Sequence, residues 1–152
     1  MKLSRRLSAL LAAAAVALAC IVVPAFAAKP KPGHWAGPTK KTTKAKTVDF
    51  DVIKSGKGRR VKAFRLHDIS VRCTPNGSLT QNQTVPAQSF PHPVKVKKNG
   101  RFKLTDTAGA QTVRVKGRFI KRRKAKGTVV FTQKTSSQKC TTGKLKWSAK
   151  LK

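Results

Sequence analysis

Lysine and arginine dominate the residues of this chain that could do chemistry, and in two segments they alternate with apolar residues. Over residues 94–105 and 112–119 basic and apolar residues take turns, which is the pattern of a β-strand with one buried and one wet face. If these segments pair, their cations share one outer sheet face, and the basic run at 121–126 extends it. The residues assigned to this patch are Lys95, Lys97, Arg101, Lys103, Arg114, Lys116, Arg118, Lys121, Arg122, Arg123, Lys124 and Lys126.

Such a face predicts the binding of a polyanion. Like charges opposite one another across strands are destabilising, so a bound polyanion would relieve a cost that the free protein carries. Counterion release would make binding fall as salt rises. The expected partner is an anionic polymer or an anionic cell-envelope surface. The alternative is a secreted structural or partner-docking module whose basic surface is solvated and has no dedicated anionic ligand.

Sequence-specific recognition of nucleic acid is not expected. Base stacking needs exposed aromatic side chains, but Tyr is absent and Phe102 and Phe119 share the apolar parity of their strands. Any nucleic acid would therefore be bound through its backbone.

Three histidines and four aspartates are the remaining candidates for catalysis. His34, His67 and His92 are scattered, and the chain has neither a Gly-x-Ser-x-Gly motif nor a metal-ligand spacing of His and Cys. Asp49 and Asp51 would lie about 7 Å apart on an exposed strand face, as counter-charges to neighbouring lysines. We therefore assign no catalytic residue, metal or cofactor. The enzymatic alternative is a hydrolase that uses His67 or His92.

The N-terminus has the organisation of a signal peptide. Three basic residues precede an apolar run, and Ala25-Phe26-Ala27 supplies an A-x-A cleavage site, which predicts export and removal of residues 1–27. The alternative is an uncleaved membrane anchor. Cleavage would remove three of the 35 basic residues, so the mature chain would carry 32 basic and 4 acidic residues, a net charge of +28 and no transmembrane span.

The cysteines predict one disulfide. Cys20 would leave with the signal peptide, and Cys73 and Cys140 would then meet an oxidising compartment. A bridge between them would stabilise the domain by about 4 kcal/mol in the chain-entropy model. The alternative is two free thiols that serve catalysis or bind a metal.

The mature chain divides into an arm and a domain. Residues 28–46 are rich in Lys, Pro, Gly and Thr, which predicts a flexible basic arm in which Trp35 could dock an edge strand onto the core. Residues 47–152 form the domain. Its first strand is expected at 47–53, and a long strand at 59–73 changes phase near His67 and Asp68, which predicts a β-bulge there.

The second half of the domain predicts two hairpins and a closing strand. The hairpins span 94–105, around Asn99-Gly100, and 112–133, whose strands are joined by the polar connection 121–126. The closing strand covers 145–149. Short strands separated by turn residues indicate an all-β fold, a single antiparallel β-sandwich or small barrel with one disulfide.

Residues 76–93 differ from their surroundings because they contain no Lys or Arg. In a chain this basic, such a stretch is a candidate lid or ligand rim, and the alternative is an ordinary crossover loop.

Five short motifs of glycine, aromatic and cysteine residues, taken in their order along the chain, resemble those of a known family. The motifs are Gly-x-Trp from Gly33, Asn-Gly-Arg-Phe from Asn99, Gly-Arg-Phe from Gly117, Ala-x-Gly-Thr from Ala125 and Cys-Thr-x-Gly from Cys140. In this order the chain resembles a family of small secreted actinobacterial all-β domains of uncharacterised function, usually called hypothetical or secreted proteins. The resemblance implies fold and export and carries no catalytic residue. The high lysine content departs from the family pattern.

Overall fold

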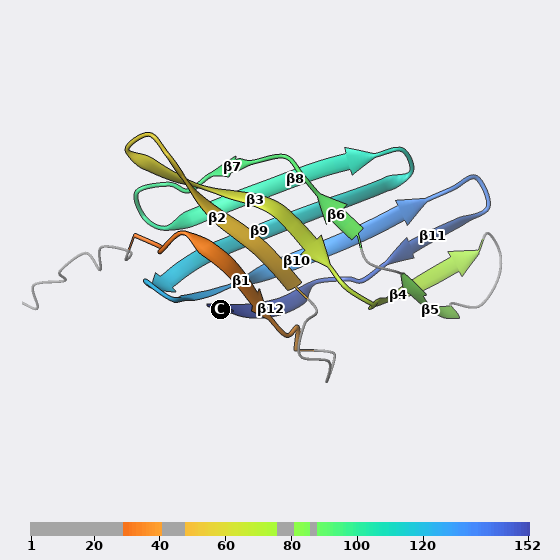
Figure 1. The fold of residues 1–152 in the computed structure, drawn as a ribbon. Helices are drawn as coiled ribbons and strands as arrows, with labels where there is room; N and C mark the ends of the chain where they lie inside the picture. The colour runs from red at the N-terminus through yellow and green to blue at the C-terminus, as the bar shows by residue number, and fades with distance from the viewer. Residues whose placement is uncertain (1–28, 41–47, 76–80, 86–87) are drawn as a thin grey trace, which may run out of the picture.

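The computed structural model describes residues 29–40, 48–75, 81–85 and 88–152, and the predicted signal peptide lies outside them. The described residues are all-β and contain no helix (Figure 1), so none of them forms a helix long and apolar enough to cross a membrane. The strands are β1 (Gly33–Gly37), β2 (Val48–Ser55), β3 (Gly58–Leu66), β4 (Ile69–Pro75), β5 (Gln81–Val85), β6 (Gln88–Phe90), β7 (Val94–Lys95), β8 (Arg101–Ala108), β9 (Gln111–Lys121), β10 (Lys124–Lys134), β11 (Gln138–Thr141) and β12 (Leu145–Leu151).

The twelve strands of the described residues form one antiparallel sheet that branches at β10. One edge of β10 pairs with β9 from Lys124 to Gln133. The other edge pairs first with β12 and then, from Thr132 to Lys134, with β11. The β12 branch continues through β1, β2 and β3, and the β11 branch continues through β4 and β5. Since β8 pairs with β9, three parts of the sheet meet at β10.

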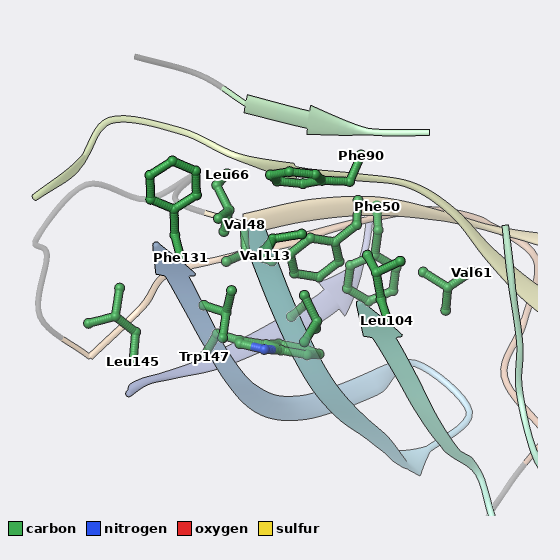
Figure 2. Packing of buried hydrophobic residues seen from close by; sticks show 14 of the residues in the cluster. Val48, Phe50, Val61, Leu66, Phe90, Leu104, Val113, Phe131, Leu145 and Trp147 are labelled. Atoms are coloured by element: carbon green, nitrogen blue, oxygen red, sulfur yellow. The ribbon is translucent and has the colours of Figure 1, made fainter. Parts of the chain in front are cut away.

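The sheet folds over so that β1, β2 and β3 lie across β8, β9 and β10, and it is not closed into a barrel (Figure 1). Phe50 of β2 lies at the centre of the core. Its ring centroid is 5.8 Å from that of Phe64, 5.9 Å from that of Phe102 and 5.8 Å from that of Trp147, so it contacts both layers (Figure 2). The predicted all-β antiparallel fold is confirmed, with two packed layers.

The predicted hairpin at 112–133 is confirmed as β9 and β10. Its inward-facing residues Val113, Val115 and Phe119 are fully buried. The connection is shorter than predicted, because only Arg122 and Arg123 form the turn and β10 begins directly after them. The predicted closing strand is also confirmed, as β12.

The predicted hairpin at 94–105 is wrong, although its turn is present. The amide of Gly100 donates to the carbonyl of Lys97 at 2.8 Å, and Gly100 has a φ of 72°. However, β7 pairs with β3 rather than with β8, and the amide of Val96 donates to the carbonyl of Arg59 at 2.9 Å. The chain therefore crosses from one layer to the other at this turn. Alternation fixes which face a strand buries but not which strand it joins.

The phase change at His67 and Asp68 is a strand break rather than the predicted bulge. Asp68 has a φ of 46°, and the chain passes there from β3, beside β2, to β4, beside β11. An irregular register lies earlier in β3, where Ala63 has a φ of 50° and β2 shifts its register between Asp49 and Asp51.

Strand β1 corrects the predicted boundary between arm and domain. Part of the arm predicted at 28–46 is an interior strand, which pairs with β2 on one side and β12 on the other. Trp35 explains this position, because its fully buried ring lies 6.0 Å from that of Phe50 and 5.0 Å from that of Phe119. Burial of so large an aromatic side chain stabilises a strand here, although the basic composition of the segment predicted a flexible arm. The arm residues 41–46 lie outside the described residues.

The uncharged stretch 76–93 is neither a lid nor a plain loop where the structure describes it. It contains β5, which pairs with β4, and β6, which pairs with β3. Phe90 is buried in the core (Figure 2). Residues 76–80 and 86–87 lie outside the described residues.

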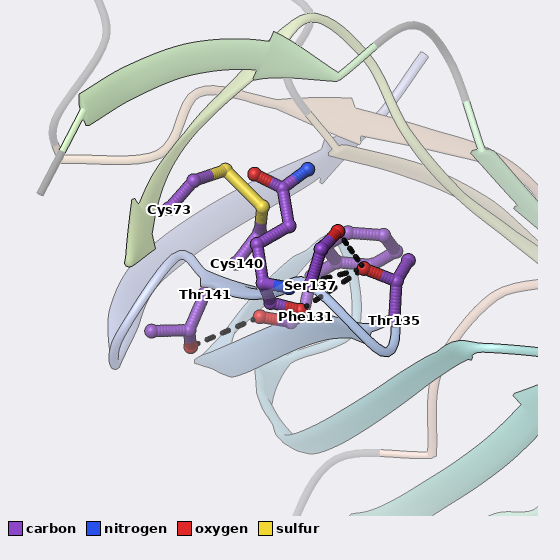
Figure 3. The surroundings of a disulfide bond; sticks show 7 residues. Cys73, Phe131, Thr135, Ser137, Cys140 and Thr141 are labelled. Atoms are coloured by element: carbon purple, nitrogen blue, oxygen red, sulfur yellow. Dashed lines mark hydrogen bonds between the residues drawn. A yellow bond between two sulfur atoms is a disulfide. The ribbon is translucent and has the colours of Figure 1, made fainter. Parts of the chain in front are cut away.

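The predicted disulfide between Cys73 and Cys140 is confirmed (Figure 3). The two cysteines are directly opposite one another in β4 and β11, with their Cα atoms 3.9 Å apart. Beside the bridge, the hydroxyl of Thr141 donates to the carbonyl of Phe131 at 3.2 Å. The bridge therefore links β4 to β11, the strand that pairs with β10.

Reducing this disulfide, or replacing Cys73 and Cys140 by alanine, is expected to lower the free energy of unfolding by about 4 kcal/mol. The two cysteines are 67 residues apart in the sequence, so the bridge closes a large loop. Removing the bridge therefore raises the conformational entropy of the unfolded chain. Urea denaturation of the oxidised and reduced proteins measures the difference. Coincident midpoints would contradict the prediction.

Candidate anion-binding site

Four neighbouring strands, β8, β9, β10 and β12, present their outward side chains on one surface, which we call the basic face. Arg101 in β8 lies opposite Arg118 in β9, and Arg118 lies opposite Lys126 in β10. Two residues along, Lys103 lies opposite Lys116. Cations therefore form rows across the strands, with like charges in directly paired positions.

Two glycines on the inner side of these strands bring β9 and β10 close together. Gly117 lies between Phe102 and Gly127 in the register, and Gly127 lies opposite Trp147. A Cβ atom on Gly117 would overlap the ring of Phe102. One on Gly127 would overlap both the ring of Trp147 and the carbonyl oxygen of Lys116. The two aromatic rings thus occupy the space of the missing side chains, which glycine permits at a close backbone approach.

At these glycines the basic face contains a cavity of about 710 Å³, which we call the face hollow. Its volume lies within the range of small-ligand sites, about 300–1,000 Å³. No acidic residue lines it, and Thr128 and Ser148 add hydroxyl groups. The cationic lining residues are Lys40, Arg101, Lys116, Arg118, Lys126 and Lys146.

Two buried donor atoms belong to the lining of the face hollow. Among the described residues, Arg118 Nε and Trp147 Nε1 are the buried side-chain nitrogens without a hydrogen-bond partner. Both carry N–H groups and need an acceptor. Buried polar groups are rarely left unpaired in proteins. Arg118 has the outward parity of β9, so its Nε is consistent with a ligand that brings acceptor oxygens, whereas the ring of Trp147 packs in the core against Phe50 and Phe64.

Two cations of the face hollow were missed from the sequence. Lys40 lies in the segment predicted as an arm, but its amide donates to the carbonyl of Lys146 at 2.9 Å and Thr39 bridges to Trp147. Lys146 shows the alternation of a strand, but its neighbourhood depends on the pairing of β12 with β10. Outward parity could have added Lys146 to the patch, whereas nothing in the sequence placed Lys40 there.

Lys95 and Lys97 were predicted on the basic face, and the structure corrects this. Because β7 pairs with β3, their side chains instead line a second cavity of about 450 Å³, which we call the end hollow. This hollow also contains no acidic residue. Its cationic lining residues are Lys29, Lys57, Arg59, Lys95, Lys97 and Lys98.

The other predicted residues lie around the face hollow. Lys103 and Arg114 are exposed on the basic face without lining the hollow. The β9–β10 turn and its flanking residues are exposed as well; they are Lys121, Arg122, Arg123 and Lys124.

Two carboxylates, Asp49 and Asp51, lie in β2 of the opposite layer, beside an arginine and two histidines. Asp49 accepts hydrogen bonds from Arg65 and His67, and Asp51 lies 3.0 Å from His34 and 3.4 Å from Arg65. These groups form one chain across β1, β2 and β3. Asp49 is buried rather than exposed as expected. Within the described residues, the partners of Asp49 and Asp51 are one arginine and two histidines rather than the expected lysines.

For the predicted hydrolase, the structure shows two His–Asp pairs, and both lie away from the two hollows. His67 contacts Asp49, and His92 lies 2.8 Å from Asp106. Neither histidine lines the face hollow or the end hollow. Within the described residues, no group of three or more His, Cys, Asp or Glu side chains could hold a metal ion.

Comparison with known proteins adds no relative: no family model matches the chain, and neither a curated protein nor a solved structure matches it. The function must therefore be argued from the site itself.

Gly127→Ala is expected to lower the free energy of unfolding by about 3 kcal/mol, because the new methyl group meets backbone as well as Trp147. The matched control is Gly58→Ala, where the nearest atom to the added Cβ, the carbonyl oxygen of Ser55, is 3.4 Å away. Thermal denaturation of both variants provides the measurement. An equal loss in the two would show that the close approach at Gly127 is not needed.

Asp49→Asn is expected to lower the free energy of unfolding by about 2 kcal/mol, because Arg65 and His67 lose a buried charged partner. Asp51→Asn is expected to cost less than about 1 kcal/mol, since the Asp51 side chain is 36% exposed and that of Asp49 only 10%. Urea denaturation compares the two. A larger cost for Asp51→Asn would contradict this ranking.

Proposed function

We propose that this protein is a secreted, non-catalytic β-domain that associates electrostatically with an anionic polymer or an anionic cell-envelope surface. The observation that supports this most directly is the face hollow, whose lining has six cationic residues and no acidic one. The six cations surround one cavity and act on the same volume. A basic surface that is only solvated does not need such an arrangement.

The arrangement of the strands gives the ligand a physical role. Arg101, Arg118 and Lys126 are held in one row by backbone pairing, so their Cα atoms cannot move apart to reduce the repulsion between the side chains. A bound anion lowers this repulsion and releases counterions from its own phosphates or sulfates. Binding is therefore expected to weaken strongly as salt increases.

The lining chemistry favours an oxyanion. Arg101 and Arg118 present planar guanidinium groups that suit bidentate contacts with phosphate. Thr128 and Ser148 can donate further hydrogen bonds. A phosphate or sulfate group can accept all of these bonds at once, whereas a single halide cannot.

The exposed apolar surface gives less support to a partner-docking module. Among the described residues, the exposed large hydrophobic side chains are Ile53 and Ile120, at 36% and 38% exposure. Two such residues on separate strands are ordinary for a protein surface. The surface is therefore distinguished by its positive charge and not by exposed apolar side chains.

The triple variant Lys116→Gln, Arg118→Gln and Lys126→Gln is expected to elute from a heparin or phosphate-polymer column at clearly lower salt than the wild type. The slope of log affinity against log salt should fall by about one for each cation that contacts a phosphate.

A matched control removes the same charge elsewhere. Arg72, Lys134 and Lys139 are exposed residues of β4, β10 and β11, away from both hollows, and Arg72→Gln, Lys134→Gln and Lys139→Gln remove three positive charges. This control should elute close to the wild type. If both triple variants elute together, net charge alone governs retention and the proposed site is wrong.

A further inference from the structure

The end hollow is a second built cavity with the same chemistry as the face hollow. It lies at the end of the molecule where the β2–β3, β7–β8 and β9–β10 turns and the segment before β1 come together (Figure 1). Arg59 holds this end in place, because its Nε donates to the carbonyl of Pro30 at 3.1 Å and its Nη1 to that of Gly58 at 3.0 Å. The amide of Lys31 donates to the carbonyl of Arg122 at 3.1 Å.

Two consecutive residues line the two hollows. Gly100 lines the end hollow, and the next residue, Arg101, lines the face hollow. The turn between them is fixed, because the amide of Lys97 donates to the carbonyl of Arg101 at 2.9 Å and the amide of Phe119 donates to that of Gly100 at 2.9 Å. The linings of the two hollows are therefore joined through this fixed turn, one on the sheet face and one at the sheet end.

We propose that one linear, flexible phosphate polymer occupies both hollows and bends over Gly100 and Arg101. This inference rests on the proposed function and specifies its ligand class. Each hollow alone has the volume of a small-ligand site, about 710 Å³ and 450 Å³, so a short phosphate fits in one and only a longer chain reaches both. Two linked contacts raise the affinity through the effective concentration of the second.

The shape of the surface argues against the other polyanions. A flat bilayer contacts one plane and cannot enter a cavity on the face and another at the end together. Double-stranded nucleic acid is too stiff to bend over one turn, since its persistence length is about 150 base pairs. Single-stranded nucleic acid is bound by stacking on exposed aromatic rings, but every described Phe and Trp side chain is buried. A phosphate chain without bases requires neither feature.

The experiment compares tripolyphosphate with long-chain linear polyphosphate, by calorimetry at fixed salt, on the wild type and three triple variants. The end-hollow variant is Lys57→Gln, Lys95→Gln and Lys98→Gln. The face-hollow variant is Lys116→Gln, Arg118→Gln and Lys126→Gln, and the charge-matched control is Arg72→Gln, Lys134→Gln and Lys139→Gln. For the wild type and the control, the long chain is expected to bind about 100-fold more tightly than tripolyphosphate.

In the end-hollow variant this ratio should fall by about tenfold, while tripolyphosphate binds the intact face hollow with the affinity that it has in the control. A ratio equal to that of the control would overturn the two-hollow inference and leave the face hollow as the only site. If the face-hollow variant also binds tripolyphosphate as the control does, the proposed function itself fails.

Two further probes separate the sources of phosphate. Poly(glycerol phosphate), a phosphodiester polymer, should show the same dependence on the end hollow as polyphosphate does. Vesicles of anionic phospholipid should bind the end-hollow variant and the control equally. Vesicle binding that depends on the end hollow as strongly as polyphosphate binding does would overturn the assignment to a linear polymer.

Discussion

The structure depends on burial of one apolar side of each strand, which must outweigh the repulsion between cations on the other side. Phe50 contacts rings from both layers, and Val113, Val115 and Phe119 bring β9 against them without exposed surface. The same strand carries Arg114, Lys116 and Arg118 outward, and Lys116 and Arg118 lie opposite other cations. The backbone pairing of the strands thus couples favourable burial on one side to unfavourable charge repulsion on the other. The strands that carry the cations cannot move apart unless the core opens.

Charge is distributed unequally between the two layers. Across β1, β2 and β3, the chain from His34 through Asp51, Arg65 and Asp49 to His67 places carboxylates beside their cationic and imidazole partners. Asp106 has the inward parity of β8 and contacts His92, so it adds no negative charge to the basic face. The few aspartates are therefore used for local structure in one layer and at one strand edge. The face hollow gains its charge from this arrangement as well as from the number of lysines.

Sequence patterns predicted side-chain parity well and strand neighbours poorly. Alternation in β8, β9 and β12 correctly separated buried from exposed residues, and the cysteine count predicted the disulfide. Alternation depends on neighbouring residues, and the disulfide depends on the number of cysteines. The partner of β7 depends on neither, because Val94 buries the same face whether it pairs with β3 or with β8. For the same reason composition placed β1 in an arm, since a basic segment becomes a strand only when a large core is available for Trp35.

This difference between parity and pairing explains how the candidate site arises. A β7–β8 hairpin would have placed Lys95 and Lys97 on the basic face, as one flat patch. Because β7 joins β3, the chain instead crosses between the layers at the Lys97–Arg101 turn, and the same cations surround a cavity on the other side of Gly100. Gly117 and Gly127 line the first cavity, and the rings of Phe102 and Trp147 pack against them on the inner side. Two adjacent hollows therefore replace a flat surface, and a ligand that fits both must be able to bend.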